Sequence, residues 1–567
     1  MTRIVLVNCR GAGSATRLAT EHLGLASLAA VLARDGFGVT VLDANYEPIS
    51  RRVLLRRIQE QAPALVGFTL YYNNADATVR TIEDLRKAGC RSHVTLGGHH
   101  ATFNALELLA EWTAVDSVVR GEGEGALLDL ARAVSTGQAW DALPNLACRR
   151  DSQPHANPCR PLIADLNQLP HPHREAFART LRRTRTATVL SSRGCFGRCT
   201  FCSIRAFYRF SDGPCWRPLD PCRVVDEIEA LVRAHGVNRI RFMDDEFAGP
   251  GERGRRRARA IAAEILGRRL DVRFTVVCRP DSLDADLLDD LLKAGLECVD
   301  VGVESWVPRQ LALYGKGVSA AQNWAAVETL ERLGIPYRLY VMPIDPYVTP
   351  DELRQNLEAV ARIGLEHFHD NSFLTRLIPF RGTAIHERLR EEGVLSPSSG
   401  GITTRRLGYR FQDPRMRRLY PHIRQLARGL HKASERLRRL FRAPFSDAEA
   451  LAFGADVKQA LTRAVLECCL DLLASDRPDA VGPSVRATLA ELERATDAIA
   501  GAWQRGKFER CAPVAVRIGC RKIVFPRPAV REATTLLVSA MCRSALPRVP
   551  RCRTSKGNRR DCESGLR

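Results

Sequence analysis

Three cysteines that lie close together in the sequence form the most informative pattern of this chain. Cys195, Cys199 and Cys202 stand in the string CFGRCTFC, with three residues in the first gap and two in the second. Thiolates are the usual protein ligands of iron–sulfur clusters, and ligands so close in sequence can hold one cluster from a single loop. A zinc site usually shows two separated ligand pairs instead. The alternative is three core cysteines that are neighbours by chance, since the chain has 18 cysteines among 567 residues.

Three thiolates on a four-iron cluster leave one iron free, and an open metal position indicates chemistry rather than scaffolding. The elements around the cysteines must then position that iron. A β-branched segment, TATVLSSRG, precedes them and is typical of a buried strand that runs into a loop.

After this loop, strand and helix signals alternate. The strands are expected at Thr188–Leu190, Arg239–Met243, Val272–Cys278, Cys298–Val303, Pro336–Met342 and Phe368–Leu374, and the helices at Asp226–His235, Ser282–Ala294, Ala320–Gly334 and Pro350–Gly364. Ser282, followed by acids, and Thr349 before Pro350 are the expected helix starts. Six such units predict a parallel sheet in a partial (β/α)6 barrel of the TIM type. Active groups of such folds lie at the C-terminal strand ends, where the cysteine loop is expected.

The CxxxCxxC string after the first strand of a βα array resembles the radical S-adenosylmethionine (radical SAM) superfamily. FMDDEF (242–247) resembles the family's acidic site for the amino group of SAM, which implies Asp244 or Asp245 as the acceptor. The alternative for these acids is a helix N-cap or a solvated loop. VGVES (301–305) is similar to the segment that carries a family glutamate, here Glu304, and LIPFRGTAI (377–385) to the segment after the sixth strand.

Two further residues extend this resemblance. Phe201 matches the aromatic residue that usually lies near the adenine. Arg279, in CRPD after the third strand, is expected to meet the methionine carboxylate or to form a surface ion pair.

The first 150 residues show a second alternation of strands and helices, typical of a doubly wound, flavodoxin- or Rossmann-like domain. Five strands are expected at Arg3–Asn8, Val39–Leu42, Leu65–Thr69, Val94–Leu96 and Ser117–Arg120, with helices that include Leu25–Arg34 and Ala77–Lys87. No GxGxxG follows the first strand, so a dinucleotide site is not expected.

Four segments of this region resemble the cobalamin-binding domain that precedes many radical SAM cores. They are EHLGLASLAAVL with Gly24, GFTLYYN with Thr69 and Leu70, TLGGHHAT with Gly97 and Gly98, and RGEGE with Gly121 and Glu122. Glycines there let the backbone lie close to a ligand. The alternative is a flavodoxin-like fold without a cofactor.

One departure from the cobalamin-binding pattern concerns the cobalt. The Asp-x-His-x-x-Gly motif that ligates cobalt from below is missing, so a histidine at that place is not expected as the lower ligand. His99 and His100 follow the fourth strand and are expected to line the nucleotide tail instead.

The chain therefore divides into five expected parts. They are a cobalamin-binding-like domain (1–143), a proline-rich linker (144–187), a radical SAM core (188–395), a helical C-terminal region (396–547) and a disordered basic tail (548–567). Helical spacing in the C-terminal region covers Ile423–Phe441, Asp447–Ala474 and Val485–Ala502. The late cysteines, Cys511, Cys520, Cys542, Cys552 and Cys562, have no regular spacing, and a second cluster stays an open alternative.

Composition limits the function classes. The hydrophobic fraction of 45% is enough for a core in each domain, and the net charge of +21 gathers partly in an arginine-rich stretch at 405–442. No aromatic-basic interleaving supports nucleic-acid binding, and no apolar run or leader indicates a membrane or secretion. A cytoplasmic, reducing location is expected, since disulfide frameworks belong to small secreted chains.

The combined resemblance implies a cobalamin-dependent radical SAM methyltransferase with a 4Fe-4S cluster, SAM and cobalamin. One SAM would methylate reduced cobalamin, and a 5′-deoxyadenosyl radical from a second would activate an unactivated carbon of a small-molecule or peptide natural-product intermediate. It also implies an external electron donor of the flavodoxin or ferredoxin type. The alternatives are a cyclase or rearrangement enzyme without methyl transfer, a non-catalytic cobalamin sensor, and a transfer-RNA methylthiotransferase, whose N-terminal cluster cysteines are missing here.

Overall fold

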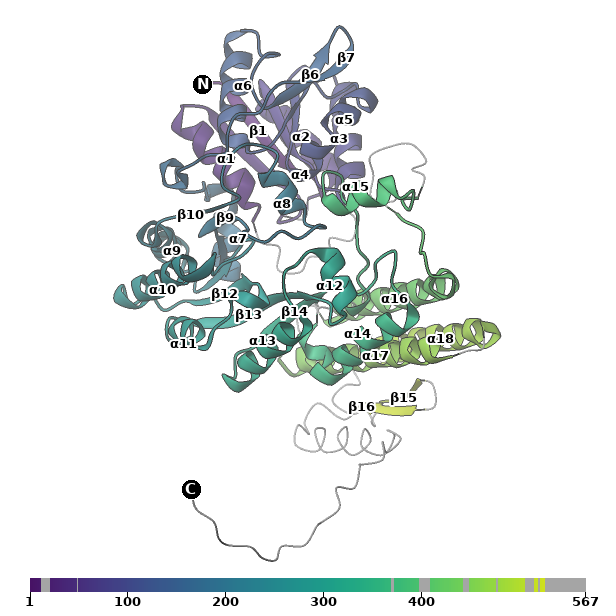
Figure 1. The fold of residues 1–567 in the computed structure, drawn as a ribbon. Coiled ribbons are helices and arrows are strands. Elements are labelled where there is room, and N and C mark those ends of the chain that lie inside the picture. The colour runs from purple at the N-terminus through teal and green to yellow at the C-terminus, as the bar shows by residue number, and fades with distance from the viewer. Residues whose placement is uncertain are drawn as a thin grey trace, which may run out of the picture. The chain divides into compact units, whose positions relative to one another are not determined.

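The computed structural model describes residues 1–11, 21–47, 49–368, 372–396, 408–441, 448–475, 478–504, 514–518 and 521–525. The chain forms two compact units, Met1–His431 with Val465–Arg486, and Lys432–Ala464 with Ala487–Arg567. Its two larger sheets are a mainly parallel sheet of seven strands and an entirely parallel sheet of five strands, each with its own helices (Figure 1).

The N-terminal sheet has seven strands in the order β2-β1-β3-β4-β5-β6-β7. Strands β1 (Arg3–Asn8), β2 (Gly38–Asp43), β3 (Leu65–Thr69), β4 (His93–Gly97) and β5 (Ser117–Val119) are parallel, which confirms the doubly wound prediction. Their helices are α1 (Leu23–Arg34), α2 (Arg51–Gln61), α3 (Ala75–Lys87), α4 (His99–Phe103), α5 (Ala105–Glu111) and α6 (Gly123–Thr136).

Helices cover both faces of this sheet, with α1 and α6 on one side and α2, α3 and α5 on the other (Figure 1). The strands are accordingly apolar on both faces, and Val5, Val66 and Val94 are completely buried. Two short strands, β6 (Leu146–Arg150) and β7 (Gln153–Ala156), extend the sheet in antiparallel fashion. They fall in the range that the prolines indicated as a linker, so its first part belongs structurally to the sheet.

The second sheet has the order β14-β13-β12-β11-β8 and is entirely parallel. Its strands are β8 (Thr186–Val189), β11 (Arg239–Phe242), β12 (Arg273–Cys278), β13 (Leu296–Glu304) and β14 (Tyr337–Val341). The helices of this region are α7 (Ala178–Thr184), α8 (Ser203–Tyr208), α9 (Pro221–His235), α10 (Gly251–Gly267), α11 (Ala285–Lys293), α12 (Pro308–Tyr314), α13 (Ala320–Arg332), α14 (Pro350–Ile363) and α15 (Ala384–Glu391).

The two predicted helix starts have different outcomes. Thr349 caps α14 through a reciprocal capping box with Glu352, and Pro350 occupies the first turn, as expected. The start at Ser282 was wrong: Pro280–Ser282 is a short 3₁₀ turn, and the side chain of Asp284 accepts a hydrogen bond from Leu287 N to cap α11.

The sixth expected strand, Phe368–Leu374, does not form a strand among its described residues. Single bridges join Leu339 to Phe368 and Ile344 to Arg376, and Ser372–Leu374 is a 3₁₀ turn. The sheet of this domain is thus a five-stranded partial barrel with only isolated bridges at the sixth position.

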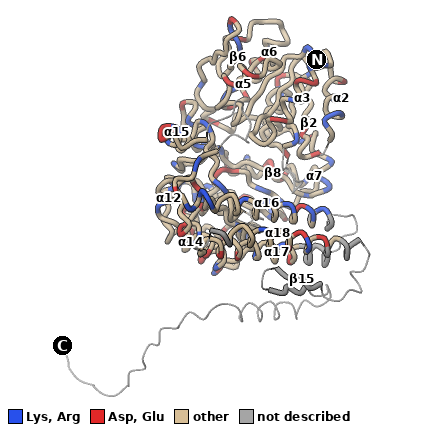
Figure 2. Tube along the Cα trace, turned by 90° about the vertical axis from the view of Figure 1, so that its right-hand side faces the viewer, with Lys and Arg blue, Asp and Glu red and all other residues tan. Residues whose placement is uncertain are grey.

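The C-terminal region is mainly helical, as predicted, with α16 (Pro414–Phe441), α17 (Ala448–Ala474) and α18 (Pro478–Gln504). Lysine and arginine residues are frequent along α16 (Figure 2). An unpredicted hairpin of β15 (Val514–Ile518) and β16 (Arg521–Phe525) follows. The expected tail at 548–567 and the late cysteines lie outside the described residues. Within the described ranges, no helix combines the length and the apolar character that crossing a bilayer requires.

Candidate active site

The cysteine loop follows the edge strand β8 of the second sheet. After β8, Ser192–Gly194 forms β9, which pairs antiparallel with β10 (Trp216–Pro218) and leads directly into Cys195. Gly194 has a φ of +82°, and a Cβ there would lie 1.8 Å from the carbonyl oxygen of Cys215. Only glycine fits this turn, so the backbone before the first cysteine has one available path.

The three cysteines are unpaired thiols that are partly accessible on this loop. Burial raises the pKa of Cys195 to about 12 and that of Cys202 to about 11, and each feels a neighbouring thiolate. These thiols therefore hold their protons until a metal displaces them. In the described part of the chain, no three His, Cys, Asp or Glu side chains converge as they would around a single ion. A four-iron cluster binds each thiolate at a different iron, so a spread loop of three thiols fits it.

Arg279 brings a positive charge to this loop. Its Nη1 lies 3.8 Å from Cys199 Sγ, and its guanidinium lies 5.3 Å from the centre of the Phe196 ring. Asp281 accepts two hydrogen bonds from Arg279, and the carbonyl of Lys316 accepts a third at 2.7 Å. The ion-pair alternative is therefore observed, with Asp281 as the partner, but Arg279 is 7% exposed and the pair is not on the surface.

The three acids after β11 face different surroundings. Asp244 is buried, and its oxygens accept hydrogen bonds from Ser191 N at 3.0 Å, Ser191 Oγ at 2.7 Å and Ser192 Oγ at 2.5 Å. Arg257 lies 3.9 Å away. Asp244 therefore joins the end of β11 to the segment after β8, and three of its acceptor positions are already used by Ser191 and Ser192.

Asp245 and Glu246 are both close to the start of the cysteine loop. Asp245 Oδ2 accepts a hydrogen bond from Gly194 N at 3.1 Å. Glu246 is 0% exposed, and its Oε2 accepts one from Gly249 N at 2.6 Å. Burial raises the pKa of both carboxyl groups to about 7.

Glu246 is the residue of this segment that sequence reasoning missed. Its charge raises the pKa of Cys195, and the positive charge of Arg279 acts on it in turn. Among the described residues no donor forms a well-aligned hydrogen bond to its Oε1. The buried Ser282 hydroxyl, likewise without a well-aligned partner, is a nearby donor whose hydrogen bonding helps to lower the pKa of Glu246. A buried carboxylate oxygen with a free lone pair beside the thiols can accept a bond from a cationic ligand. The sequence signal that could have identified Glu246 is its position as the third consecutive acid of FMDDEF (242–247).

Glu304 ends β13 in a strained conformation. Its φ is +62°, and the register with β14 shifts at this point. Lys316 Nζ lies 3.0 Å from its carboxylate. Such a backbone in a non-glycine residue costs free energy and is frequent at functional sites. Phe201, in the cysteine loop, packs edge-on against Tyr314 with ring centroids 5.4 Å apart.

A cavity of about 470 Å³ lies between the N-terminal sheet and the cysteine loop. Most of the cobalamin-site candidates line it, namely Gly24, Thr69, Gly97, Gly98, Gly121 and Glu122. Leu190, Arg193, Tyr208, Met243 and Asp245 line it from the second domain. Leu70 is completely buried and is not on its wall. Of the residues predicted for the cluster and SAM, Asp245 lines the cavity, whereas Phe201, Asp244, Arg279, Glu304 and the three cysteines do not.

The cavity wall has room for a flat ligand because of its glycines. Gly98 has a φ of +96°, and a Cβ there would lie 3.2 Å from Thr69 Oγ1 and 3.3 Å from the Leu70 carbonyl. Tyr71 and Met243, 38% and 43% exposed, present apolar surface on the wall. This shape and lining fit a large, partly apolar cofactor such as cobalamin.

His22 also lines the cavity, which the sequence did not predict. Its Nδ1 accepts the Leu25 N–H at 3.1 Å, so in the neutral ring Nε2 carries the proton and donates to Tyr71 Oη at 3.0 Å. Burial lowers the pKa of His22 to about 4. Both residues line the cavity.

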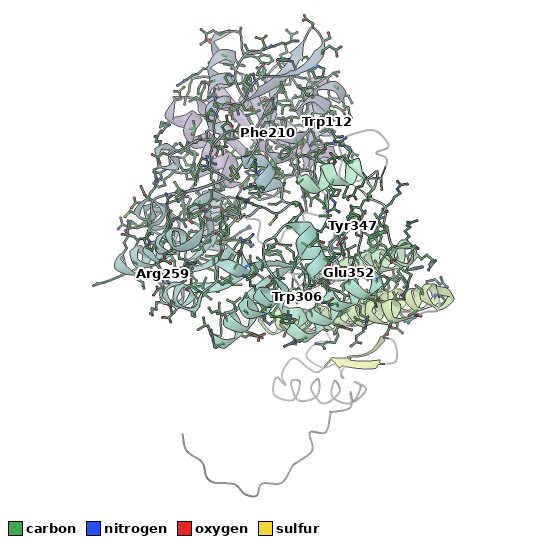
Figure 3. All side chains as sticks on the ribbon, viewed as in Figure 1. Trp112, Phe210, Arg259, Trp306, Tyr347 and Glu352 are labelled. Atoms are coloured by element: carbon green, nitrogen blue, oxygen red, sulfur yellow. The ribbon has the colours of Figure 1, made fainter. Side chains whose placement is uncertain are left out.

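Helix α8 carries aromatic rings from the cysteine loop to the N-terminal domain. His99 of α4 lies parallel to Phe207 of α8 with ring centroids 4.1 Å apart. Phe210, which follows α8 and is labelled in Figure 3, meets Phe103 edge-on with ring centroids 6.0 Å apart. Burial lowers the pKa of His99 to about 4, so the ring is neutral. His99 lines the cavity. These contacts fix the end of the cysteine loop against the cavity wall.

Comparisons with known proteins agree with this arrangement. The model of the Radical SAM superfamily matches residues 189–360, and that of the B12 binding domain matches residues 11–131. An uncharacterized methyltransferase of Pyrococcus horikoshii is 27% identical over 414 residues, which cover 72% of this chain and 86% of that protein. The anaerobic magnesium-protoporphyrin IX monomethyl ester cyclase of Rubrivivax gelatinosus is 30% identical over 322 residues, 55% of this chain and 56% of the cyclase.

A solved structure has the same fold. The cobalamin-dependent S-adenosylmethionine radical enzyme OxsB, with aqua-cobalamin and S-adenosylmethionine bound, superposes with a TM-score of 0.69 at 16% identity, covering 89% of this chain and 81% of OxsB. The two domains and the helical region that follows them therefore form a known combination.

Proposed function

Because the chain is a radical SAM enzyme with a B12-binding domain, we propose that it transfers a methyl group from cobalamin to an unactivated carbon of a small substrate. The single observation that carries the proposal is the cavity, whose walls come from the glycines of the first domain and from residues beside the cysteine loop of the second. A substrate in this cavity would be in reach of both cofactors, and orientation is the main contribution that a protein makes to such a reaction.

The residues of the cysteine loop would hold the 4Fe-4S cluster and SAM. In our proposal, Cys195, Cys199 and Cys202 bind three irons, and the cluster with SAM supplies a 5′-deoxyadenosyl radical when both are bound. Glu246 accepts the amino group of SAM, since its Oε1 is buried and without a partner among the described residues. Arg279 offsets the negative charge of the thiolates.

Four further residues have supporting roles in this proposal. Glu304, held by Lys316, and the ring of Phe201 face the ribose and adenine side. Asp245 holds Gly194 N and keeps the first turn of the loop in place. Asp244 acts on the loop only through Ser191 and Ser192.

The glycines of the first domain would hold cobalamin, which supplies a transferable methyl group when bound. Gly97, Gly98 and Gly121 let the backbone approach the ring system, and Gly24 and Thr69 contribute the neighbouring wall. Protein side chains already hold the carboxylate of Glu122, so its proposed contact with cobalamin is through the backbone. His22 donates its Nε2 proton to Tyr71, which leaves no lone pair for cobalt.

Radical SAM enzymes need a reductant and act on small substrates. We propose an electron donor of the flavodoxin or ferredoxin type, a natural-product intermediate or a peptide as the substrate, and a cytoplasmic location. We likewise retain the domain boundaries 1–143, 144–187, 188–395 and 396–547 as proposals, with β6 and β7 as an extension of the first sheet.

A second candidate function is ring formation without methyl transfer. The similarity to the magnesium-protoporphyrin cyclase favours it, although the chain spans just over half of that protein's length. Product mass separates the two functions, because a methyl group adds 14 mass units and a cyclisation does not.

Anaerobic reconstitution with iron, sulfide and hydroxocobalamin tests the proposal. The reconstituted protein is incubated with SAM, a reductant and an extract of candidate substrates, and 5′-deoxyadenosine, S-adenosylhomocysteine and methylated product are quantified. We expect all three, and a Cys199→Ala variant should form none of the deoxyadenosine. Deoxyadenosine without S-adenosylhomocysteine would refute methyl transfer and favour the cyclase alternative.

A further inference from the structure

A buried ion cluster joins two loops. One is the segment 121–122, which lines the cavity, precedes α6 and is called the cavity loop below; the other is the cysteine loop. The cluster consists of Glu122 and Glu124, at the start of α6, and of Arg193 and Arg217, on the paired strands β9 and β10. Arg217 donates to both oxygens of Glu122 at 2.9 Å. Arg193 donates to Glu122 at 3.0 Å and to Glu124 at 2.5 Å.

The cluster is shielded from water. The side chains of Arg217, Glu122, Glu124 and Arg193 are 2%, 8%, 8% and 14% exposed. Burial acts to lower the pKa of Arg193, but the carboxylates of Glu124 and Glu122 outweigh it and raise the pKa. Buried ion pairs of this kind add little stability over apolar packing, so a role in fixing geometry accounts better for them.

The cluster lies one or two residues from both cofactor sites. Gly121, next to Glu122, lines the cavity, and its N–H donates to Thr102 Oγ1 at 3.1 Å. Arg193 is followed by Gly194 and then by Cys195. Register pairs Arg193 with Arg217, so both arginines are held on one rigid two-stranded ribbon. The backbone of the cavity loop and that of the cysteine loop thus meet through four charged side chains.

A backbone contact adds to this connection. Ile163 N donates to Glu122 Oε2 at 2.8 Å, and Arg217 Nη1 donates to the Ile163 carbonyl at 2.6 Å. Since Glu122 accepts four hydrogen bonds from three residues, it cannot shift without breaking several of them. A displacement of the cavity loop would consequently move Arg193 and the first cysteine.

We propose that this ion cluster couples the two cofactor sites, so that cobalamin in the cavity changes the affinity of the cysteine loop for SAM. Glu124 and Arg193 line the cavity, but their charged groups are bonded to each other, so we assign them a positioning role rather than a direct bond to either cofactor. The coupling is reciprocal: SAM changes the affinity for cobalamin by the same factor. The inference rests on both cofactors binding where we propose, but it needs no knowledge of the substrate.

The test measures the dissociation constant of SAM by equilibrium binding to the iron-loaded protein, with and without hydroxocobalamin. In the wild type we expect the two constants to differ by about fivefold or more, within the usual range of coupling between sites. In Glu124→Gln the ratio should fall toward one, while SAM binding without cobalamin stays within about twofold of the wild-type value.

Glu107→Gln is the matched control. Glu107 forms an ion pair with Arg381 that also joins the two domains, but its side chain is 47% exposed and does not line the cavity. The same substitution there should keep the wild-type ratio. If Glu124→Gln does not load iron, Arg193→Lys provides the second test. Lysine keeps the positive charge but lacks the two guanidinium nitrogens that bond Glu122 and Glu124 at the same time. The ratio of the two SAM dissociation constants should also fall toward one in this variant.

The failures are distinguishable. Protein that binds no iron or no cobalamin contradicts the proposed function itself. Protein that binds both but shows a wild-type ratio of one, or an unchanged ratio in Glu124→Gln, overturns the coupling alone.

Discussion

Replacing Glu246 with glutamine should weaken SAM binding and leave the iron–sulfur cluster in place. Glutamine keeps the size of the side chain, and its amide oxygen can still accept the Gly249 N–H that Glu246 Oε2 now accepts at 2.6 Å. The substitution removes only the negative charge and one acceptor, the Oε1 that has no partner among the described residues. The local backbone is therefore expected to stay as it is.

The size of the effect follows from the type of bond that is lost. A hydrogen bond to a charged group contributes about 1.5–3 kcal/mol. Such a loss corresponds to a rise of about 10- to 150-fold in the Kd for SAM. Thermal stability of the cofactor-free protein at pH 8 should be unchanged or higher, because burial raises the pKa of Glu246 to about 7 and a buried charge is then removed.

The assay is equilibrium binding of SAM to protein whose iron content has been measured. Asp245→Asn is the matched control, since Asp245 is the neighbouring buried carboxyl group and its Oδ2 contacts Gly194 N instead. We expect that control to stay within about threefold of the wild-type Kd. An unchanged Kd in Glu246→Gln, with normal iron content, would refute the role of Glu246.

Three further predictions concern the cluster, the cavity and pH. Cys199→Ala should lose the iron absorbance near 400 nm, whereas alanine at the exposed Cys222 should keep it; equal iron in both variants would contradict the cluster assignment. Gly98→Ala should abolish retention of cobalamin on gel filtration, because the new Cβ would lie 3.2 Å from Thr69 Oγ1 on the cavity wall. Gly36→Ala is its control, since Gly36 has a similar φ of +89° but open space around it. This control should lose a comparable free energy of unfolding, about 1 kcal/mol, and still retain cobalamin. The stabilising contribution of His99 should be lost between about pH 6.5 and pH 4, because burial lowers its pKa to about 4 and only the unfolded chain takes up its proton in this range, whereas Asp245 and Glu246, whose pKa burial raises to about 7, act in the opposite direction on the whole protein. The stability of His99→Gln relative to the wild type should therefore rise from pH 7.5 to pH 5, by at most about 3 kcal/mol; a difference in urea midpoints that does not change with pH would contradict this.

The sequence predicted those parts of the site whose residues all lie within one short segment. The cysteine string, the glycine pair at Gly97 and Gly98 and the two alternating domains all depend on neighbours in sequence, and the fold and the shared cavity agree with them. The segment alone could not predict which acid of FMDDEF, Asp244, Asp245 or Glu246, has an oxygen available to a ligand. Ser191 and Ser192, more than 50 residues earlier, occupy Asp244 and leave Glu246 with a free oxygen.

Long-range pairing also explains the misjudged elements. The strands β6 and β7 lie among prolines that indicated a linker, and they form because β5 offers a free sheet edge. The segment at Phe368–Leu374 has the apolar character of a strand, but its described residues make a single bridge, from Phe368 to Leu339 of β14. Neither outcome can be derived from the residues of the segment alone.

The bonds of Asp244 have a consequence for how this enzyme matures. They tie the backbone just before the cysteine loop to the end of the adjacent strand, and they need no metal. Most of the conformational entropy of the first turn is therefore lost when the chain folds, not when iron arrives. Cluster assembly would then start from a largely prearranged scaffold, and metal-free protein should accept its irons after synthesis without refolding.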